Sequence, residues 1–328
     1  MNFSDLKSFL GEDWTKTEDL ICSSLKSDIN LLNETNELLL SNSGKQLRPI
    51  LSLLCARACA GGSVSRDSIR FAAAAELLHN ATLLHDDVAD DSPQRRGRPT
   101  VYSLLGAQAS VLIGDYWLVK AMQTILSARS RVSEVVRIFS KTLSDLAEGE
   151  MLQLQKTSTA DTTQEDYFRI IYSKTASLFE ASALSAAISV GASEEWTKAV
   201  RDYAVSLGLA FQIRDDIFDY STSSVQIGKP VGIDLHEQKI TLPLLGALAK
   251  VSDSQDKRIR QMVSEIVEKP SYADQIRDFV LENGGVEYAQ AKLNEYVDAA
   301  LHSLIPLPDS PEKEWLDFLA RFTADRKK

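Results

Sequence analysis

Six aspartates in two identical patterns are the residues of this sequence best suited to chemistry. The pattern Asp-Asp-x-x-Asp occurs as "DDVAD" at residues 86–90 and again as "DDIFD" at residues 215–219. At ordinary aspartate usage, one such match arises by chance in about one chain in thirty, and two in far fewer. The repetition therefore indicates a functional site rather than a solvated acidic helix end.

Both patterns lie at the C-terminal ends of predicted helices, because a polar, turn-forming segment follows each. Acids four residues apart repel each other there, and a helix C-terminus already carries about half a negative charge. On a helix Asp86 and Asp90 share one face at about 6 Å, whereas Asp87 points about 100° away. Such carboxylate oxygens suit Mg²⁺, which prefers one or two carboxylates together with water and substrate phosphates.

Basic residues accompany the acidic patterns, several of them beside Gly- and Pro-containing turns. They are Lys45, Arg48, Arg95, Arg96, Lys174, Lys229 and Lys239. Each alone is ordinary surface charge. Next to Mg²⁺-type carboxylates, however, they predict a substrate that carries a diphosphate, gripped through metal on one side and through Arg and Lys on the other.

The composition is that of an ordinary globular protein. Of 328 residues, 44% are hydrophobic and 25% charged, and the net charge of -10 argues against a nucleic-acid partner. Three cysteines leave one unpaired in any disulfide scheme, which favours a reducing compartment. The start of the chain lacks the features of a signal peptide, and no apolar run is long enough to span a bilayer, so we expect a cytoplasmic protein.

The distribution of apolar residues predicts an all-α protein. Long stretches have a helical period, for example 15–40, 66–91 and 164–191, and strand signals are almost absent. No break has the length or low complexity of a domain linker, so a single domain over 1–328 is expected. Helices over about 255–323 follow the part of the chain that carries the motifs.

These residues resemble those of trans-type polyprenyl diphosphate synthases, the head-to-tail prenyltransferases, of medium- and long-chain type. The resemblance runs in order from Gly44 to Pro243 and includes "GKQLRP", "ELLHNATLLHDDVADDSPQRRGRPT", "YSKTASLF", "AFQIRDDIFDY" and "GKPVGIDLHEQKITLPLL". It implies the isoprenoid synthase fold, a bundle of antiparallel helices around a deep central cavity with the two aspartate motifs at its mouth. The usual assembly of such enzymes is a homodimer.

The resemblance also implies a role for each matching residue. Mg²⁺, three ions per active site, would be bound mainly by Asp86, Asp90 and Asp215, with support from Asp87, Asp216 and Asp219. The allylic diphosphate would be bound by Arg95, Lys174, Gln212, Lys229 and Lys239. Isopentenyl diphosphate would be bound by Lys45, Arg48, His79 and Arg96.

The implied reaction is a sequential condensation of isopentenyl diphosphate with an allylic prenyl diphosphate. Metal and fixed cations neutralise the departing diphosphate while the allylic carbocation forms. The carbonyl of Lys174, the hydroxyl of Thr175 and the amide oxygen of Gln212 would steady that cation. The departed diphosphate is expected to take the proton, so no protein base is assigned. A short-chain synthase, a terpene cyclase and a non-catalytic subunit of a heteromeric synthase are the alternatives.

The length of the product is predicted from the helix that carries the first motif. Thr82 and Ala81, four and five positions before Asp86, are small where short-chain relatives typically place an aromatic plug, and Leu78 forms the next turn. A product of about C30 to C50 follows, since each 5.4 Å turn accommodates roughly one five-carbon unit. Alternatively, Ala81 is small only because two helices pack there. Contact of the apolar product with a membrane is expected to be transient.

Three departures from the family pattern stand near these motifs. Gln238 takes a position where glycine is usual, which carries a cost if the backbone there needs a positive φ. Arg214 stands where an apolar residue is more typical. The C-terminal "DRKK" is expected to be a frayed tail rather than a cover of the isopentenyl site.

Overall fold

The computed structural model describes residues 2–220 and 232–326. The chain divides into two compact units, and each holds one aspartate motif. The first unit comprises residues 1–140, 178–201 and 304–318. The second unit comprises residues 141–177, 202–303 and 319–328. The single-domain organisation expected from the sequence stays a prediction.

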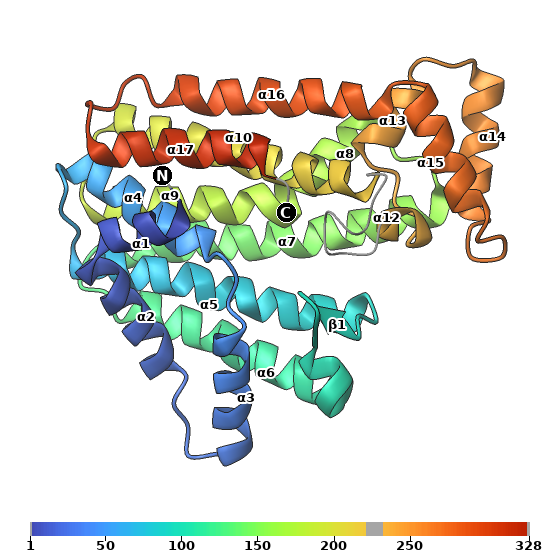
Figure 1. The fold of residues 1–328 in the computed structure, drawn as a ribbon. Helices are drawn as coiled ribbons and strands as arrows, with labels where there is room; N and C mark the ends of the chain where they lie inside the picture. Colours follow the sequence, from blue (N-terminus) through green and yellow to red (C-terminus); the bar gives the residue numbers. More distant parts are fainter. Residues whose placement is uncertain (1, 221–231, 327–328) are drawn as a thin grey trace. The chain divides into compact units, whose positions relative to one another are not determined.

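Helices make up nearly all the regular structure of the described residues, which confirms the predicted all-α class (Figure 1). In the first unit they are α1 (Phe3–Leu10), α2 (Glu12–Ser24), α3 (Asn30–Ser41), α4 (Leu47–Ala60), α5 (Arg66–Ala89) and α6 (Val101–Leu126). Those with residues in both units are α7 (Val132–Thr159), α9 (Ser177–Ser189), α10 (Glu194–Asp219) and α17 (Pro311–Asp325). In the second unit they are α8 (Gln164–Ile171), the π-helical turn η1 (Tyr172–Ala176), α12 (Ile233–His236), α13 (Leu242–Leu248), α14 (Asp253–Ser264), α15 (Tyr272–Glu282) and α16 (Gly285–Ser303).

Helix α5, which carries the first aspartate motif, is the core of the first unit. It packs against α2, α4 and α6, and every residue from Phe71 to Leu78 is buried. Figure 1 shows α6 alongside it. Gly114 of α6 permits this close approach, because a Cβ there would lie 2.4 Å from Nε2 of His85. The small residues of this stretch thus let neighbouring helices surround α5.

A two-residue hairpin follows α5 and is the one strand pair of the described residues. Strands β1 (Gln94–Arg95) and β2 (Arg98–Pro99) are antiparallel, with Arg95 opposite Arg98. Arg96 and Gly97 both have a positive φ, as in the tight turns typical of two-residue hairpins. No strand was predicted here, and the hairpin turns the chain back so that Arg95 reaches Asp87 near the end of α5.

In the second unit, η1 carries the sequence "YSKTA" and widens one helical turn. Such π-turns are frequent at functional sites. Two glycines allow neighbouring helices to approach it: a Cβ on Gly149 of α7 would lie 2.6 Å from Ser173 Cβ, and one on Gly208 of α10 would lie 2.6 Å from Ala176 Cα. Close packing therefore fixes the turn that presents Lys174 and Thr175.

The predicted helix over residues 15–40 is wrong in one respect, since the structure breaks it between α2 and α3. The side chain of Asn33 bonds Ser27 at both its backbone N–H (3.0 Å) and its carbonyl (2.7 Å), and Asn36 donates to the carbonyl of Leu25 at 2.9 Å. Asparagine side chains compete in this way with helical backbone bonds. The apolar period continues across the break, which is why periodicity alone missed it.

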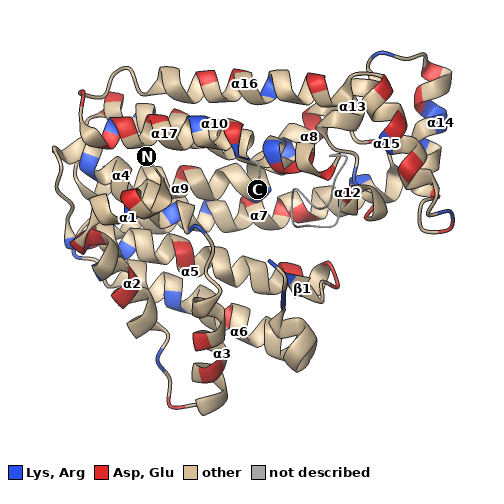
Figure 2. Cartoon of the chain, viewed as in Figure 1, with Lys and Arg blue, Asp and Glu red and all other residues tan. Residues whose placement is uncertain are grey.

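Figure 2 shows acidic and basic residues on helices along the whole described chain, so the net charge of -10 is not concentrated in one segment. None of the helices within residues 2–220 and 232–326 has the length and apolar character that a membrane crossing requires.

Candidate active site

The first aspartate motif occupies the last turn of α5. Asp87 is buried and accepts a charged hydrogen bond from Nε of Arg95 at 2.8 Å. Burial raises the pKa of this carboxyl, and the Arg95 charge opposes the rise. Asp86 is half-buried and Asp90, the C-cap, is exposed. Asp87 is therefore paired with Arg95. Asp86 and Asp90 lie one helical turn apart, and both are accessible to solvent.

The second motif ends α10, and its first residue is held by the C-terminus of the chain. Arg326 donates from Nη2 to Asp215 Oδ1 at 2.8 Å and to the carbonyl of Phe211, also at 2.8 Å. Arg214 donates to the carbonyl of Arg326 at 2.8 and 3.1 Å. The expectation of a frayed tail is therefore wrong as far as Arg326, because buried contacts fix it. Arg214 therefore binds this C-terminal segment.

Asp216 and Asp219 of this motif have different surroundings. Asp216 is buried and accepts hydrogen bonds from the hydroxyl of Tyr167 (2.6 Å) and from Nε2 of Gln212 (2.9 Å). Burial raises the pKa of Asp216 to about 7. Asp219 accepts three backbone N–H bonds, from Gly232, Ile233 and Asp234, at 2.9 to 3.0 Å. Asp219 therefore holds the start of α12, and its support of a metal stays a prediction.

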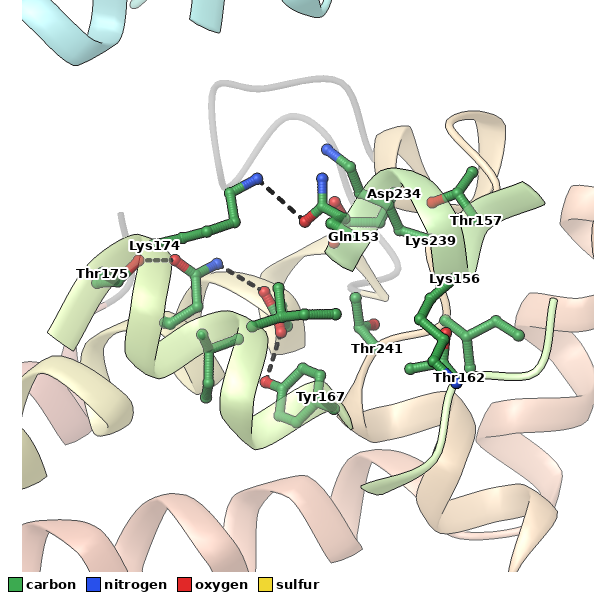
Figure 3. A pocket seen from close by; sticks show the side chains of 15 residues that line it. Gln153, Lys156, Thr157, Thr162, Tyr167, Lys174, Thr175, Asp234, Lys239 and Thr241 are labelled. Carbon is green, nitrogen blue, oxygen red and sulfur yellow. Dashed lines mark hydrogen bonds between the residues drawn. The ribbon is translucent and has the colours of Figure 1, made fainter. Parts of the chain in front are cut away.

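A pocket of the second unit joins several predicted site residues (Figure 3). Lys174, Thr175, Gln212, Asp216 and Lys239 all line it. A row of hydrogen bonds crosses it: Thr175 donates to Gln212 Oε1 at 2.8 Å, Gln212 donates to Asp216, and Tyr167 donates to Asp216 from the other side. The row fixes which way the Gln212 amide faces, with its oxygen beside Thr175.

Lys174 and Lys239, which line this pocket, contact acidic or amide side chains. Lys174 Nζ lies 2.7 Å from Glu150 Oε1 and 3.0 Å from Gln153 Oε1. Lys239 forms an ion pair with Glu237. The backbone at Gln238 has a positive φ of 56°, the condition under which glycine is preferred there. Lys229 lies outside the described residues.

A basic cluster gathers in the first unit around the start of α4. Nε of Arg48 is buried, and its guanidinium lies 4.9 Å from the ring centroid of Phe179. Arg96 donates to the carbonyl of Asn42 at 3.2 Å. Burial lowers the pKa of His79 well below its ordinary value, and the arginines lower it further. A neutral His79 can exchange hydrogen bonds with a phosphate but adds no charge.

The residues assigned to product length lie on α5 before the motif. Leu78 and Ala81 are buried, and the half-buried Thr82 donates its hydroxyl to the carbonyl of His79 at 2.8 Å. Because the Thr82 hydroxyl is hydrogen-bonded within its own helix, the surface of α5 at these residues is largely apolar. Their role in setting chain length stays a prediction.

Sequence reasoning missed Tyr167, Asp234 and Arg326. Asp234 lines the pocket, and burial together with the charges of Asp216 and Asp219 raises its pKa well above the ordinary range. Its position in "GIDLHEQK", between the predicted lysines, was the available signal. Burial and crowding disfavour the ionised form of these carboxyls, and a divalent cation bound beside them would favour it.

Three comparisons with known proteins agree on the family of this chain. The family model for polyprenyl synthetase matches residues 29–280. An octaprenyl diphosphate synthase of Escherichia coli (strain K12) is 38% identical over 330 residues, 99% of each chain. A decaprenyl diphosphate synthase structure from Rhodobacter capsulatus has a TM-score of 0.91 at 34% identity, with all of both chains covered.

A second similar structure was solved with ligands bound. It is a polyprenyl synthase from Caulobacter crescentus CB15 complexed with calcium and isoprenyl diphosphate, with a TM-score of 0.90 at 31% identity, and the match covers 100% of this chain and 98% of that one. These likenesses confirm the fold expected from the sequence.

Proposed function

Because this chain belongs to the polyprenyl synthetase family and is a prenyltransferase, we propose that it extends an allylic prenyl diphosphate with isopentenyl diphosphate to an all-trans product of about C30 to C50. The observation that carries the length is the 38% identity, over 99% of both chains, to an octaprenyl diphosphate synthase. The octaprenyl chain is therefore the first product to look for. The small, buried Ala81 before the first motif supports the same range.

We assign Mg²⁺ to the two aspartate motifs. Asp86, Asp90 and Asp215 would be its main ligands, with Asp87, Asp216 and Asp219 in support and the buried Asp234 near the second motif. Bound there, Mg²⁺ would supply the positive charge that a leaving diphosphate needs. The raised pKa values of Asp216 and Asp234 support this assignment, since a nearby dication favours their ionised forms. Three ions per active site remain a prediction.

The lysines and arginines would bind the diphosphates of the two substrates. Lys174 and Lys239 line the pocket and would exchange their present acidic partners for the allylic diphosphate, with Arg95 and Lys229 in the same role. Lys45, Arg48 and Arg96 would hold isopentenyl diphosphate, with the neutral His79 as a hydrogen-bonding partner. Charge-assisted bonds from several cations are what a diphosphate requires.

Thr175 and Gln212 would steady the allylic cation. The hydrogen-bond row fixes the amide so that its oxygen lies at the Thr175 end of the pocket. Fixed dipoles of this kind stabilise a charge that develops during reaction without needing to reorganise. No protein base is required, because the departed diphosphate can accept the proton.

A homodimer through α6 is the expected assembly. Leu112, Val119 and Leu126 repeat at seven-residue intervals, and each exposes more than half of its surface (60%, 52% and 59%). Seven residues return a helix to nearly the same face, so these side chains form an apolar stripe that another helix can cover. Light scattering of wild type and of Leu112→Lys with Val119→Lys tests this: the variant should be monomeric.

Transient membrane contact of the product and a cytoplasmic location also remain predictions. Cell fractionation of the tagged protein, with and without added isopentenyl diphosphate, checks both.

The decisive assay uses purified protein, Mg²⁺, labelled isopentenyl diphosphate and farnesyl or geranylgeranyl diphosphate, with products sized by chromatography. We expect products within the proposed range. A product that stops at the geranylgeranyl length would favour a short-chain synthase. Absence of elongation by the protein alone would favour a non-catalytic subunit of a heteromeric synthase.

A further inference from the structure

Glu76 is a buried acid on α5 that none of the roles above uses. Only 4% of its surface is exposed. Asn80, one turn later, donates from Nδ2 to the Glu76 carbonyl at 2.8 Å and to its side-chain Oε1 at 3.2 Å. The other carboxylate oxygen, Oε2, is buried and bonds no atom of the described residues. One oxygen is thus anchored and the other is available.

The charges of Arg48 and Arg96, which belong to the basic cluster of the first unit, both act on this carboxylate. Arg48 lies in the first turn of α4, and α4 packs against α5. His79 comes three residues after Glu76 and lies on the same face of α5. Nε of Arg48 is buried and, like Oε2 of Glu76, bonds no atom of the described residues. Arg96 reaches the same region from the hairpin, where its guanidinium lies against Gly44.

The charges explain why an acid is needed at this point. Burial lowers the pKa of Arg48 to about 10; the charge of Glu76 opposes this shift, whereas that of Arg96 adds to it. Burial also raises the pKa of Glu76, with Arg48 as the strongest opposing group and Arg96 and Lys7 contributing. Arg48 is half-buried and Arg96 is exposed, and two like charges close together repel each other unless an anion lies near both.

We propose that Glu76 is a positioning residue for isopentenyl diphosphate, and that its Oε2 draws the guanidinium groups of Arg48 and Arg96 toward one point where the diphosphate binds. This inference rests on the proposed function. Glu76 does not touch the substrate. It keeps the two cations converged in the free protein, so that binding does not have to order them.

Two physical effects predict opposite changes in the affinity for isopentenyl diphosphate when the charge of Glu76 is removed. A negative group near a bound diphosphate repels it, so its removal would tighten binding if only direct Coulomb interaction mattered. If Glu76 positions the arginines, its removal lets them separate, and binding weakens. The sign of the change in affinity therefore distinguishes the two.

The test is Glu76→Gln, which keeps the shape and the bond from Asn80 but removes the charge. We expect the KM for isopentenyl diphosphate to rise about tenfold, as for the loss of one charged contact, while kcat and the KM for the allylic substrate stay within about twofold. Glu76→Asp, which keeps the charge but draws it back, should raise this KM by a smaller factor. An unchanged or lowered KM in Glu76→Gln would overturn the proposal.

Asp67→Asn is the matched control, because Asp67 is a buried acid of the same helix that accepts bonds from Arg129, Ser130 and Arg70. It should lower the midpoint of thermal unfolding without moving the KM. If Glu76→Gln lowers only the midpoint, its role is structural. Should Glu76→Gln not fold, the Glu76→Asp result decides in the same way.

Equilibrium binding separates this inference from the proposed function. Calorimetry with isopentenyl diphosphate alone compares wild type and Glu76→Gln without any turnover. If wild type binds but does not elongate, the proposed function fails, whereas weaker binding by the variant still supports Glu76. If wild type elongates and the two proteins bind equally, only the role of Glu76 fails.

Discussion

Nη2 of Arg326 lies 2.8 Å from Oδ1 of Asp215, so the end of the chain neutralises the first carboxylate of the second aspartate motif. The guanidinium also lies 3.9 Å from the ring centroid of Phe211, and 8% of the residue is exposed. A buried cation with these contacts contributes through packing, hydrogen bonding and charge together. The C-terminal residues up to Arg326 therefore belong to the folded second unit.

Arg326→Ala should lower the free energy of unfolding by about 2 kcal/mol, because it leaves Asp215 and the carbonyl of Phe211 without their donor. Urea denaturation followed by circular dichroism measures the change. Lys257→Ala, at an exposed position of α14, is the control and should leave the midpoint nearly unchanged. Equal midpoints for wild type and Arg326→Ala would show that the tail adds no stability.

Ala81→Phe should shorten the product. Ala81 is buried on α5, before Asp86, and a phenyl ring there would block the path along which the growing chain is expected to extend. Chromatography of the products should show a shift toward C15 to C20, about four to five five-carbon units fewer than an octaprenyl chain. Ala291→Phe, on an exposed face of α16, is the control for the added ring. An unchanged product would mean that Ala81 is small only for helix packing.

Thr175→Val should slow the first condensation about tenfold, the effect of removing one hydrogen bond from a group that steadies a charge. Without the threonine hydroxyl, Gln212 loses the donor to its amide oxygen and keeps its hydrogen bond to Asp216. Single-turnover rates with a saturating allylic substrate measure the step. Thr124→Val removes a buried hydroxyl that bonds only within α6, and its rate should match wild type.

The helices and both aspartate motifs could be predicted from the sequence because their signals are local. The apolar period predicts the helices, and two copies of Asp-Asp-x-x-Asp are recognised by their spacing alone and predict a metal site. The spacing within the first motif predicted that Asp86 and Asp90 share one helical face. In the structure both are accessible to solvent, whereas Asp87 is paired with Arg95.

Other features depend on contacts between residues far apart in the chain. Arg326 binds Asp215 across 111 positions, and Tyr167 reaches Asp216 across 49, which no local pattern reports. Glu76 lies in an alanine-rich helix where an acid predicts a solvated face, yet it is buried in a helix that packs against α2, α4 and α6. The role of Asp219 was also hidden, since its three backbone donors come from beyond the end of α10.

The stability of the metal-free protein should fall as the pH rises from about 5 to 8 in the presence of EDTA. Burial raises the pKa of Asp216 to about 7, whereas an unfolded aspartate titrates near 4. Between these values the folded chain binds the additional proton, so a rise in pH through this window costs stability. Thermal midpoints of wild type should fall more than those of Asp216→Asn. Added Mg²⁺ should restore wild type at pH 8. Equal falls in both proteins would remove Asp216 as the cause.

Substitutions of Gln238 can separate the effect of its backbone φ on stability from the effect of its side-chain hydrogen bonds. Its φ of 56° favours glycine, yet its Nε2 donates to the carbonyls of Val263 and Ser264 at 3.3 and 2.7 Å, near the end of α14. Gln238→Gly relieves the backbone and loses these bonds, so its stability should stay near that of wild type. Gln238→Ala keeps the strained φ and also loses the bonds, and should be about 1 kcal/mol less stable than the glycine variant. Urea denaturation of the three proteins measures this order, and an alanine variant as stable as the glycine variant would contradict it.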